Sequence, residues 1–269
     1  MIEDEEIDIL LNDLFDIHGY DFTSYSKASL KRRIVRLYSL DKFPSFAELR
    51  YRVRMDTSYL KRFVEEITVN VTEMFRDPSF YQSLRNDVLP ILGTKPFIRI
   101  WHAGCSTGEE VFSMAIMLKE AGLLKKTLLY ATDLNPTVLD KVRKGIFPLT
   151  QMKQYSESYI ASGGQKDFSS YYTANYGQAK FDPELSEKII ISTHNLVSDS
   201  SFNEFDLILC RNVLIYFDKD LQDRVLKLFD ASLGSLGYLA LGTKETLKFS
   251  AVQNSYKQLN REKIWRKII

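Results

Sequence analysis

The sequence predicts an α/β protein whose main domain holds a mostly parallel sheet, with an all-helical domain before it and a small β insertion within it. Three observations predict this fold. Helical periodicity runs through the first 90 residues, apolar runs alternate with helical segments from about residue 97, and a Gly-, Ser- and Tyr-rich segment interrupts that alternation. We expect a helical domain over residues 1–90 and an α/β domain over 91–269, with the insertion at about 151–185.

The first 90 residues show the apolar spacing of amphipathic helices. In EEIDILLNDLFDIHGYDF the residues that share a stripe are Ile7, Leu10, Leu11, Leu14 and Ile17. In KASLKRRIVRLYSL they are Leu30, Ile34, Leu37 and Leu40, and the cations that lie off the stripe are Lys31, Arg32, Arg33 and Arg36. No strand-like alternation interrupts this part of the sequence.

From FIRIWHAG onward, short apolar runs alternate with helix-like segments. The apolar runs that we expect to be strands include TLLYATD, EKIIISTHNL, FDLILCRNVLIYF and GYLALGT. Between them, VFSMAIMLKEAG ends at Gly122 and NPTVLDKVRKGIF starts with Pro136 in its first turn, as helices do. Continuous apolar strands joined by helices are typical of a parallel sheet that is covered on both faces.

Residues 151–185 are too long for an ordinary connection between a strand and a helix. We interpret them as an excursion from the sheet that holds a small antiparallel hairpin. A connector without regular structure is the alternative.

The composition excludes several classes of protein. The chain has 269 residues, 45% hydrophobic residues and a formal net charge of +1, which argues against a large nucleic-acid interface. No stretch is as apolar and long as a membrane helix, and the acidic start MIEDEEIDIL lacks the basic region of a signal peptide. The two cysteines and three histidines lack metal-ligand spacing. We therefore expect a cytoplasmic protein without nucleic acid, membrane insertion or metal.

The loop AGCSTGEE, after the first predicted strand, points to a ligand site. Ligands of open α/β sheets bind at the carboxyl ends of the strands, where a Gly-rich loop lets the backbone come close. Glu109 and Glu110 would repel a dinucleotide diphosphate, so a nicotinamide oxidoreductase is disfavoured. They suit S-adenosylmethionine, which carries a sulfonium and an α-ammonium but no phosphate.

Asp133, at the end of the next predicted strand, is placed to accept both ribose hydroxyls of that cofactor. Each acid also has an ordinary structural interpretation. Glu109 or Glu110 could complement the helix dipole, and Asp133 could cap the following helix. Loop, spacing and strand context together favour the cofactor.

Five motifs occur in an order that resembles a known family. NVTEMFR (70–76), GCSTGEE (104–110), ATDLN (131–135), HNL (194–196) and CRNVLIYF (210–217) look like those of the CheR family of chemotaxis-receptor protein-glutamate O-methyltransferases. The resemblance covers nearly the whole chain and implies a Rossmann-like S-adenosylmethionine-dependent methyltransferase fold. Met74 replaces an aromatic residue of the family pattern, and Val111 replaces its usual proline.

The resemblance also implies roles for single residues. The positions that match cofactor-binding residues are Asn70, Thr72, Arg76, Glu110, Asp133, Asn195, Leu196, Asn212 and Val213. Arg76 and Tyr216 match residues beside the transferred methyl group. Glu109 remains the second candidate for the contact assigned to Glu110.

The implied reaction transfers a methyl group from S-adenosylmethionine to glutamate carboxylates of a chemoreceptor, giving methyl esters and S-adenosylhomocysteine. Glutamate is ionised at neutral pH, since its reference pKa is about 4.3, so no general base is required. The resemblance further implies that the N-terminal helices, with their cations, face the cytoplasmic helical domain of the receptor. It places the insertion where some family members grip a receptor tether. We expect a monomer.

Two alternatives stay open. The chain could be a catalytically silent S-adenosylmethionine-binding sensor or scaffold in a chemosensory pathway, or it could methylate a small molecule or nucleic acid. The weak basic balance, and the lack of an N-P-P-[YF]-like motif, count against nucleic acid.

Overall fold

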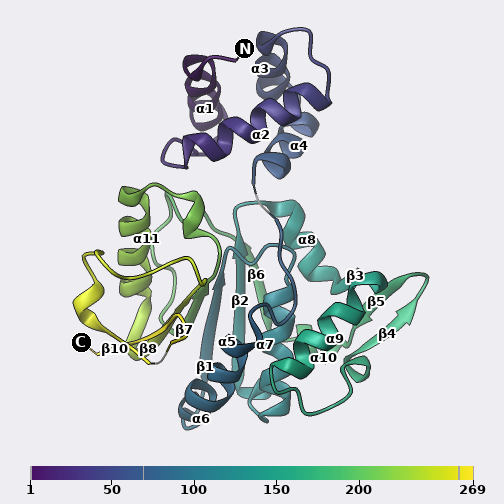
Figure 1. Ribbon diagram of the computed structural model, residues 1–269, viewed down its shortest axis with the longest axis vertical. Coiled ribbons are helices and arrows are strands. Elements are labelled where there is room, and N and C mark those ends of the chain that lie inside the picture. Colours follow the sequence, from purple (N-terminus) through teal and green to yellow (C-terminus); the bar gives the residue numbers. More distant parts are fainter. Residues whose placement is uncertain (1, 69, 260, 269) are drawn as a thin grey trace.

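The computed structural model describes residues 2–68, 70–259 and 261–268, and Figure 1 shows a helical domain above an α/β domain. The helices of residues 2–68 are α1 (Asp4–His18), α2 (Lys27–Leu40), α3 (Phe46–Met55) and α4 (Thr57–Ile67). Their apolar stripes form one cluster that runs from Ile7 to Ile67. Ile17 and Leu40, expected on these stripes, lie on the surface, each in the last turn of its helix. No helix of the described residues is long and apolar enough to cross a membrane.

The helices that follow residue 77 belong to the α/β domain. They are α5 (Pro78–Ser83), a π-helical turn (Leu84–Val88) and α6 (Leu89–Leu92). Phe80, Leu84 and Leu92 pack into the same core as strand β1. The packing therefore changes before Met74, earlier than the boundary expected at residue 90. Periodicity identifies a helix but does not show which core it packs against.

Within the described residues, seven strands form one sheet in the order β6-β2-β1-β7-β8-β10-β9. Their bounds are β1 (Ile98–Ala103), β2 (Thr127–Asp133), β6 (Ile189–Thr193), β7 (Phe205–Cys210), β8 (Leu233–Leu241), β9 (Tyr256–Gln258) and β10 (Ile264–Lys267). The pairs from β6 to β8 are parallel, and β10 pairs antiparallel with β8 and β9. The expected mostly parallel sheet is confirmed.

Helices cover both faces of the sheet. The first face carries α7 (Glu109–Glu120), α8 (Pro136–Lys144), α5 and the insertion, and the second carries α11 (Lys219–Ser232). Alternate residues of β1 point to the two sides, with Ile98 and Ile100 in one core and Trp101 in the other. This explains why the strand is apolar throughout rather than alternating with polar residues.

The insertion forms a second sheet. Its strands are β3 (Ile146–Pro148), β4 (Tyr172–Asn175) and β5 (Gln178–Phe181), and its helices are α9 (Met152–Ala161) and α10 (Pro183–Ser186). β5 pairs antiparallel with both neighbours, so the expected hairpin is present as β4–β5. The excursion begins at Ile146, a few residues before the expected start, and lies at the right of Figure 1.

The helical domain sits over the carboxyl ends of the parallel strands. The strand register brings the ends of β1, β2 and β7 to this edge, which Figure 1 shows facing the helical domain. Tyr25 and Phe217 form an isolated antiparallel β-bridge, and the backbone N–H of Ser26 donates to the carbonyl of Tyr216 over 2.8 Å. The domain junction and the ligand-binding edge of the sheet are therefore the same place.

The first loop of this edge depends on Gly104. Its φ of 75° lies in the left-handed region, and a Cβ there would come within 2.6 Å of Val213 Cγ2. Only glycine allows the loop after β1 to interlock with the loop after β7.

We predict that Gly104→Ala lowers the free energy of unfolding by about 2 kcal/mol more than Gly177→Ala, because only the former adds overpacking. Gly177 is a matched control, with a φ of 73° and no atom within 4 Å of an added Cβ. Urea unfolding of both variants measures the difference. Equal losses would contradict the close approach of Val213.

Candidate active site

A cavity lies between the carboxyl ends of the strands and the linker that joins the domains. Its volume is about 1020 Å³, including space open to solvent, which is in the range of small-molecule sites. The residues predicted from the sequence all line it: Asn70, Thr72, Arg76, Glu110, Asp133, Asn195, Leu196, Asn212, Val213 and Tyr216. Glu109 is not among the described residues that line it.

Glu110 is a largely buried carboxylate that is ionised at neutral pH. Its Oε1 lies 2.9 Å from His102 Nδ1, and its Oε2 accepts from Arg211 Nη1 over 3.3 Å. Burial alone would raise the pKa of Glu110, but His102 and Arg211 outweigh it and lower that pKa. At neutral pH a negative charge therefore lies at the start of α7, at the cavity.

Glu109 has a different environment. Its side chain is 5% exposed and accepts a hydrogen bond from the Thr107 hydroxyl over 2.5 Å. Burial raises the pKa of Glu109. Its position in the first turn of α7, away from the cavity, agrees with the dipole-complementing alternative for one acid of the pair.

Asp133 organises two loops at the end of β2. Its Oδ2 accepts from the Ser106 N–H over 2.9 Å, and its Oδ1 accepts from the Asn135 N–H over 3.0 Å. The cap of α8 is Asn135, whose Oδ1 accepts from Thr137, so Asp133 is not the helix cap. Burial raises the pKa of Asp133, although both backbone N–H groups act in the opposite direction.

Arg211 was missed by the sequence reasoning, although it stands beside Asn212 in CRNVLIYF. Its side chain is 3% exposed, and its Nη2 donates to Asp77 Oδ2 over 2.7 Å and to the Arg76 carbonyl over 3.0 Å. Its guanidinium lies 4.0 Å from the ring centre of Phe80. A charged residue at the end of an apolar strand was the available signal, because buried cations need fixed partners.

Arg33 was expected only as part of a basic helix, and it turns into the junction instead. Its Nη1 donates to the Ile67 carbonyl over 2.6 Å, and its guanidinium lies 5.0 Å from the ring centre of Tyr216. Burial lowers the pKa of Arg33, while the neighbouring Tyr216 acts in the opposite direction. Arg76 is one-third exposed at the same cavity, with its Nε 3.9 Å from Glu73 Oε1.

The cavity fits S-adenosylmethionine on three observations. Gly104 lets the backbone approach closely, and the charged Glu110 suits an ammonium group. Asn212 Oδ1 and Ser106 Oγ are buried and lack hydrogen-bond partners among the described residues. Such orphaned groups cost about 1–3 kcal/mol each unless a ligand satisfies them. Among the described residues, no group of three or more His, Cys, Asp or Glu side chains could hold a metal ion.

Sheet order, loop and donor set together define an S-adenosylmethionine-dependent methyltransferase. The family described as CheR methyltransferase, SAM binding domain, matches residues 70–264, and its all-alpha domain matches residues 5–68. The chain belongs to the CheR methyltransferase family, and S-adenosylmethionine is its cofactor.

Individual relatives agree with this assignment. The Pseudomonas putida protein Cher3 is 46% identical over 98% of this chain and 97% of its own. A chemotaxis protein methyltransferase of Listeria innocua is 32% identical over 85% of each chain. Chemotaxis protein methyltransferase 2 of Pseudomonas aeruginosa is 33% identical over 82% of this chain and 77% of its own.

We predict that Asp133→Asn weakens S-adenosylmethionine binding about tenfold or more, because a hydroxyl bonded to a charged acceptor contributes about 1.5–3 kcal/mol. Asp140→Asn is the control, since Asp140 is an exposed acid of α8. Calorimetric titration with S-adenosylmethionine and S-adenosylhomocysteine measures both variants. Wild-type affinity in Asp133→Asn would exclude the ribose contact.

We also predict that Glu110→Gln lowers the free energy of unfolding at pH 7 by about 2 kcal/mol. The lowered pKa of Glu110 means that its stabilisation is present above its ordinary value of 4.5 and is lost as the pH falls through the lowered one. The difference between wild type and variant should therefore shrink below about pH 4.5. Denaturant unfolding at several pH values tests this, and a pH-independent difference would contradict it.

Proposed function

We propose that the chain transfers the methyl group of S-adenosylmethionine to glutamate side chains of a chemoreceptor's cytoplasmic helical domain, as a cytoplasmic monomer. The products are glutamate methyl esters and S-adenosylhomocysteine. The relatives named as chemotaxis protein methyltransferases support a role in chemotaxis. The motifs of this chain support the choice of glutamate.

One observation carries the proposal: Arg76 and Tyr216 line the same cavity as Glu110 and Asp133, from the side of the domain junction. The cofactor supplies an activated methyl group on a sulfonium. An incoming carboxylate is already ionised, so it needs orientation and loss of water rather than deprotonation. Arg76 would pair with the carboxylate, and the Tyr216 hydroxyl would donate a hydrogen bond to it.

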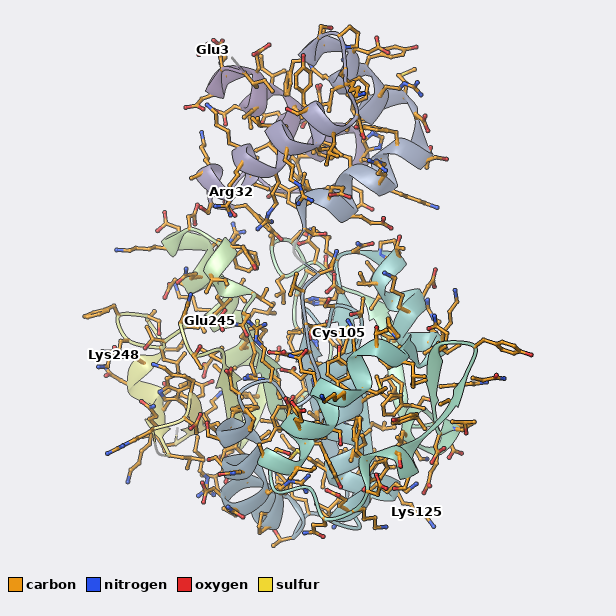
Figure 2. All side chains as sticks on the ribbon, turned by 45° about the vertical axis from the view of Figure 1, so that its right-hand side comes forward. Glu3, Arg32, Cys105, Lys125, Glu245 and Lys248 are labelled. Carbon is orange, nitrogen blue, oxygen red and sulfur yellow. The ribbon has the colours of Figure 1, made fainter. Side chains whose placement is uncertain are left out.

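The surface around the junction suits a glutamate-bearing helix. Arg32 and Arg36 are exposed and lie one turn apart on α2. Figure 2 labels Arg32 at the edge of the helical domain that faces the α/β domain. Charges of this kind steer an acidic partner toward the cavity. Lys31 contributes less, because it pairs with Asp4 over 2.5 Å.

We predict that Tyr216→Phe lowers turnover about tenfold, because one hydrogen bond to the reacting carboxylate is lost. Affinity for S-adenosylhomocysteine should stay within about twofold. Transfer of labelled methyl groups to a receptor cytoplasmic fragment measures turnover, and base-labile label identifies methyl esters. Tyr51→Phe, an exposed tyrosine of α3, is the control.

Two results would contradict the proposal. Unchanged turnover in Tyr216→Phe would remove this tyrosine from the active site. Cofactor binding by the wild type without transfer to receptor glutamates would favour the silent sensor or a different substrate.

A further inference from the structure

We propose that Glu245 is a positioning residue of the methyltransferase, whose carboxylate holds the loop of residues 211–216 in the shape that cofactor and substrate require. Asn212, Val213 and Tyr216 of this loop all line the cavity. The proposed function assigns the first two to the cofactor and Tyr216 to the substrate. The inference has two halves. The cofactor half, that Glu245 supports cofactor binding, rests on the family's cofactor. The Tyr216 half, that Glu245 positions Tyr216, rests on the proposed function.

Glu245 accepts hydrogen bonds from backbone N–H groups of the loop. Its Oε1 accepts from the Val213 N–H over 2.9 Å, and its Oε2 accepts from the Asn212 N–H over 3.0 Å. The same Oε2 accepts from the N–H of Gly242, at the end of β8, over 2.5 Å. One carboxylate thus joins the loop after β7 to the loop after β8.

Glu245 acts through the loop rather than on a ligand. Its side chain is buried, and it is not among the described residues that line the cavity. Figure 2 labels Glu245 and Cys105 on the part of the α/β domain nearer the helical domain, whereas Lys125 lies at the opposite end. Glu245 therefore lies behind the wall of the site.

The loop requires stabilising contacts from outside itself because its backbone is strained at Asn212. Asn212 has a φ of 62°, a left-handed conformation that costs a non-glycine residue about 1 kcal/mol or more. A buried carboxylate is also costly unless its oxygens are hydrogen-bonded. One contact offsets both costs, since the N–H groups of Asn212 and its neighbour Val213 supply donors that the carboxylate requires.

The effect reaches the cofactor side through packing. Val213, bonded to Glu245, fills the space that Gly104 leaves open in the first loop. Asn212 presents its unpartnered Oδ1 in the same segment. Gly242 packs closely against this contact: a Cβ there would lie 2.8 Å from both Asn212 N and Glu245 Oε2.

The test compares Glu245→Gln with Glu120→Gln. Gln keeps one acceptor oxygen but turns an amide N–H₂ toward backbone N–H groups. The side chain of Glu120 is also buried; it pairs with Arg85 over 2.6 Å and accepts from the Tyr171 hydroxyl and the Gln165 N–H, and Glu120 is not among the described residues that line the cavity. Both substitutions break a buried network, so both should lower the unfolding midpoint.

Only Glu245→Gln should weaken S-adenosylhomocysteine binding in calorimetry, by about tenfold or more. Amide hydrogen exchange should quicken at Asn212 and Val213 while β1 keeps its protection. At saturating cofactor, turnover should remain below wild type because Tyr216 has also shifted. Reduced binding with unaltered saturated turnover would support the cofactor half and reject the Tyr216 half.

Wild-type affinity in Glu245→Gln, or equal weakening in Glu120→Gln, would overturn the inference. Should Glu245→Gln not fold, Gly242→Ala presses on the same hydrogen bonds while leaving the carboxylate in place. It should weaken S-adenosylhomocysteine binding likewise, and unchanged binding would overturn the inference. Because S-adenosylhomocysteine binding is measured without any receptor, the binding results do not depend on whether glutamate is the substrate; only the turnover result does.

Discussion

The buried guanidinium of Arg211 is the interaction on which the site depends. It contacts Glu110 at the start of α7 and both the Arg76 carbonyl and Asp77 in the linker. A buried charge is tolerated only when its partners are held in place, and removing one partner of such a pair costs about 3–5 kcal/mol. The three segments that carry the cavity walls are therefore required to meet at one point.

The linker between the domains is fixed on its other side as well. The N–H of Phe75 donates to Ser113 Oγ over 3.0 Å, and its ring lies 5.2 Å from those of Tyr81 and Tyr159. Tyr159 belongs to helix α9 of the insertion, so the insertion packs directly against the segment that carries Arg76. Phe75 and Asp77 both have positive φ values, which this packing stabilises.

The sequence indicated the sheet and the acids of the cavity because both leave local signals, whereas the other cavity residues were expected only from the motifs shared with the family. A strand followed by AGCSTGEE, and an acid at the end of the next strand, are visible in one dimension. Arg211 and Glu245 act across long sequence separations, Arg211 on Asp77 and Glu245 on Val213. No local period encodes such pairs. The domain boundary was misplaced for a related reason, since α5 has the pattern of a helix but packs on a core formed by later residues.

The distribution of charge around the cavity suits a cationic cofactor beside the anionic substrate of the proposed function. Glu110 and Asp133 lie on the sheet side, and Glu110 keeps its charge although Arg211 neutralises part of it. Arg76 lies on the junction side, more exposed than Arg211 and only loosely paired with Glu73. A guanidinium with two close acids has little attraction left for a third, whereas a loosely paired one retains it. Arg211 is therefore suited to holding the walls together, and Arg76 is suited to meeting the carboxylate of the proposed substrate.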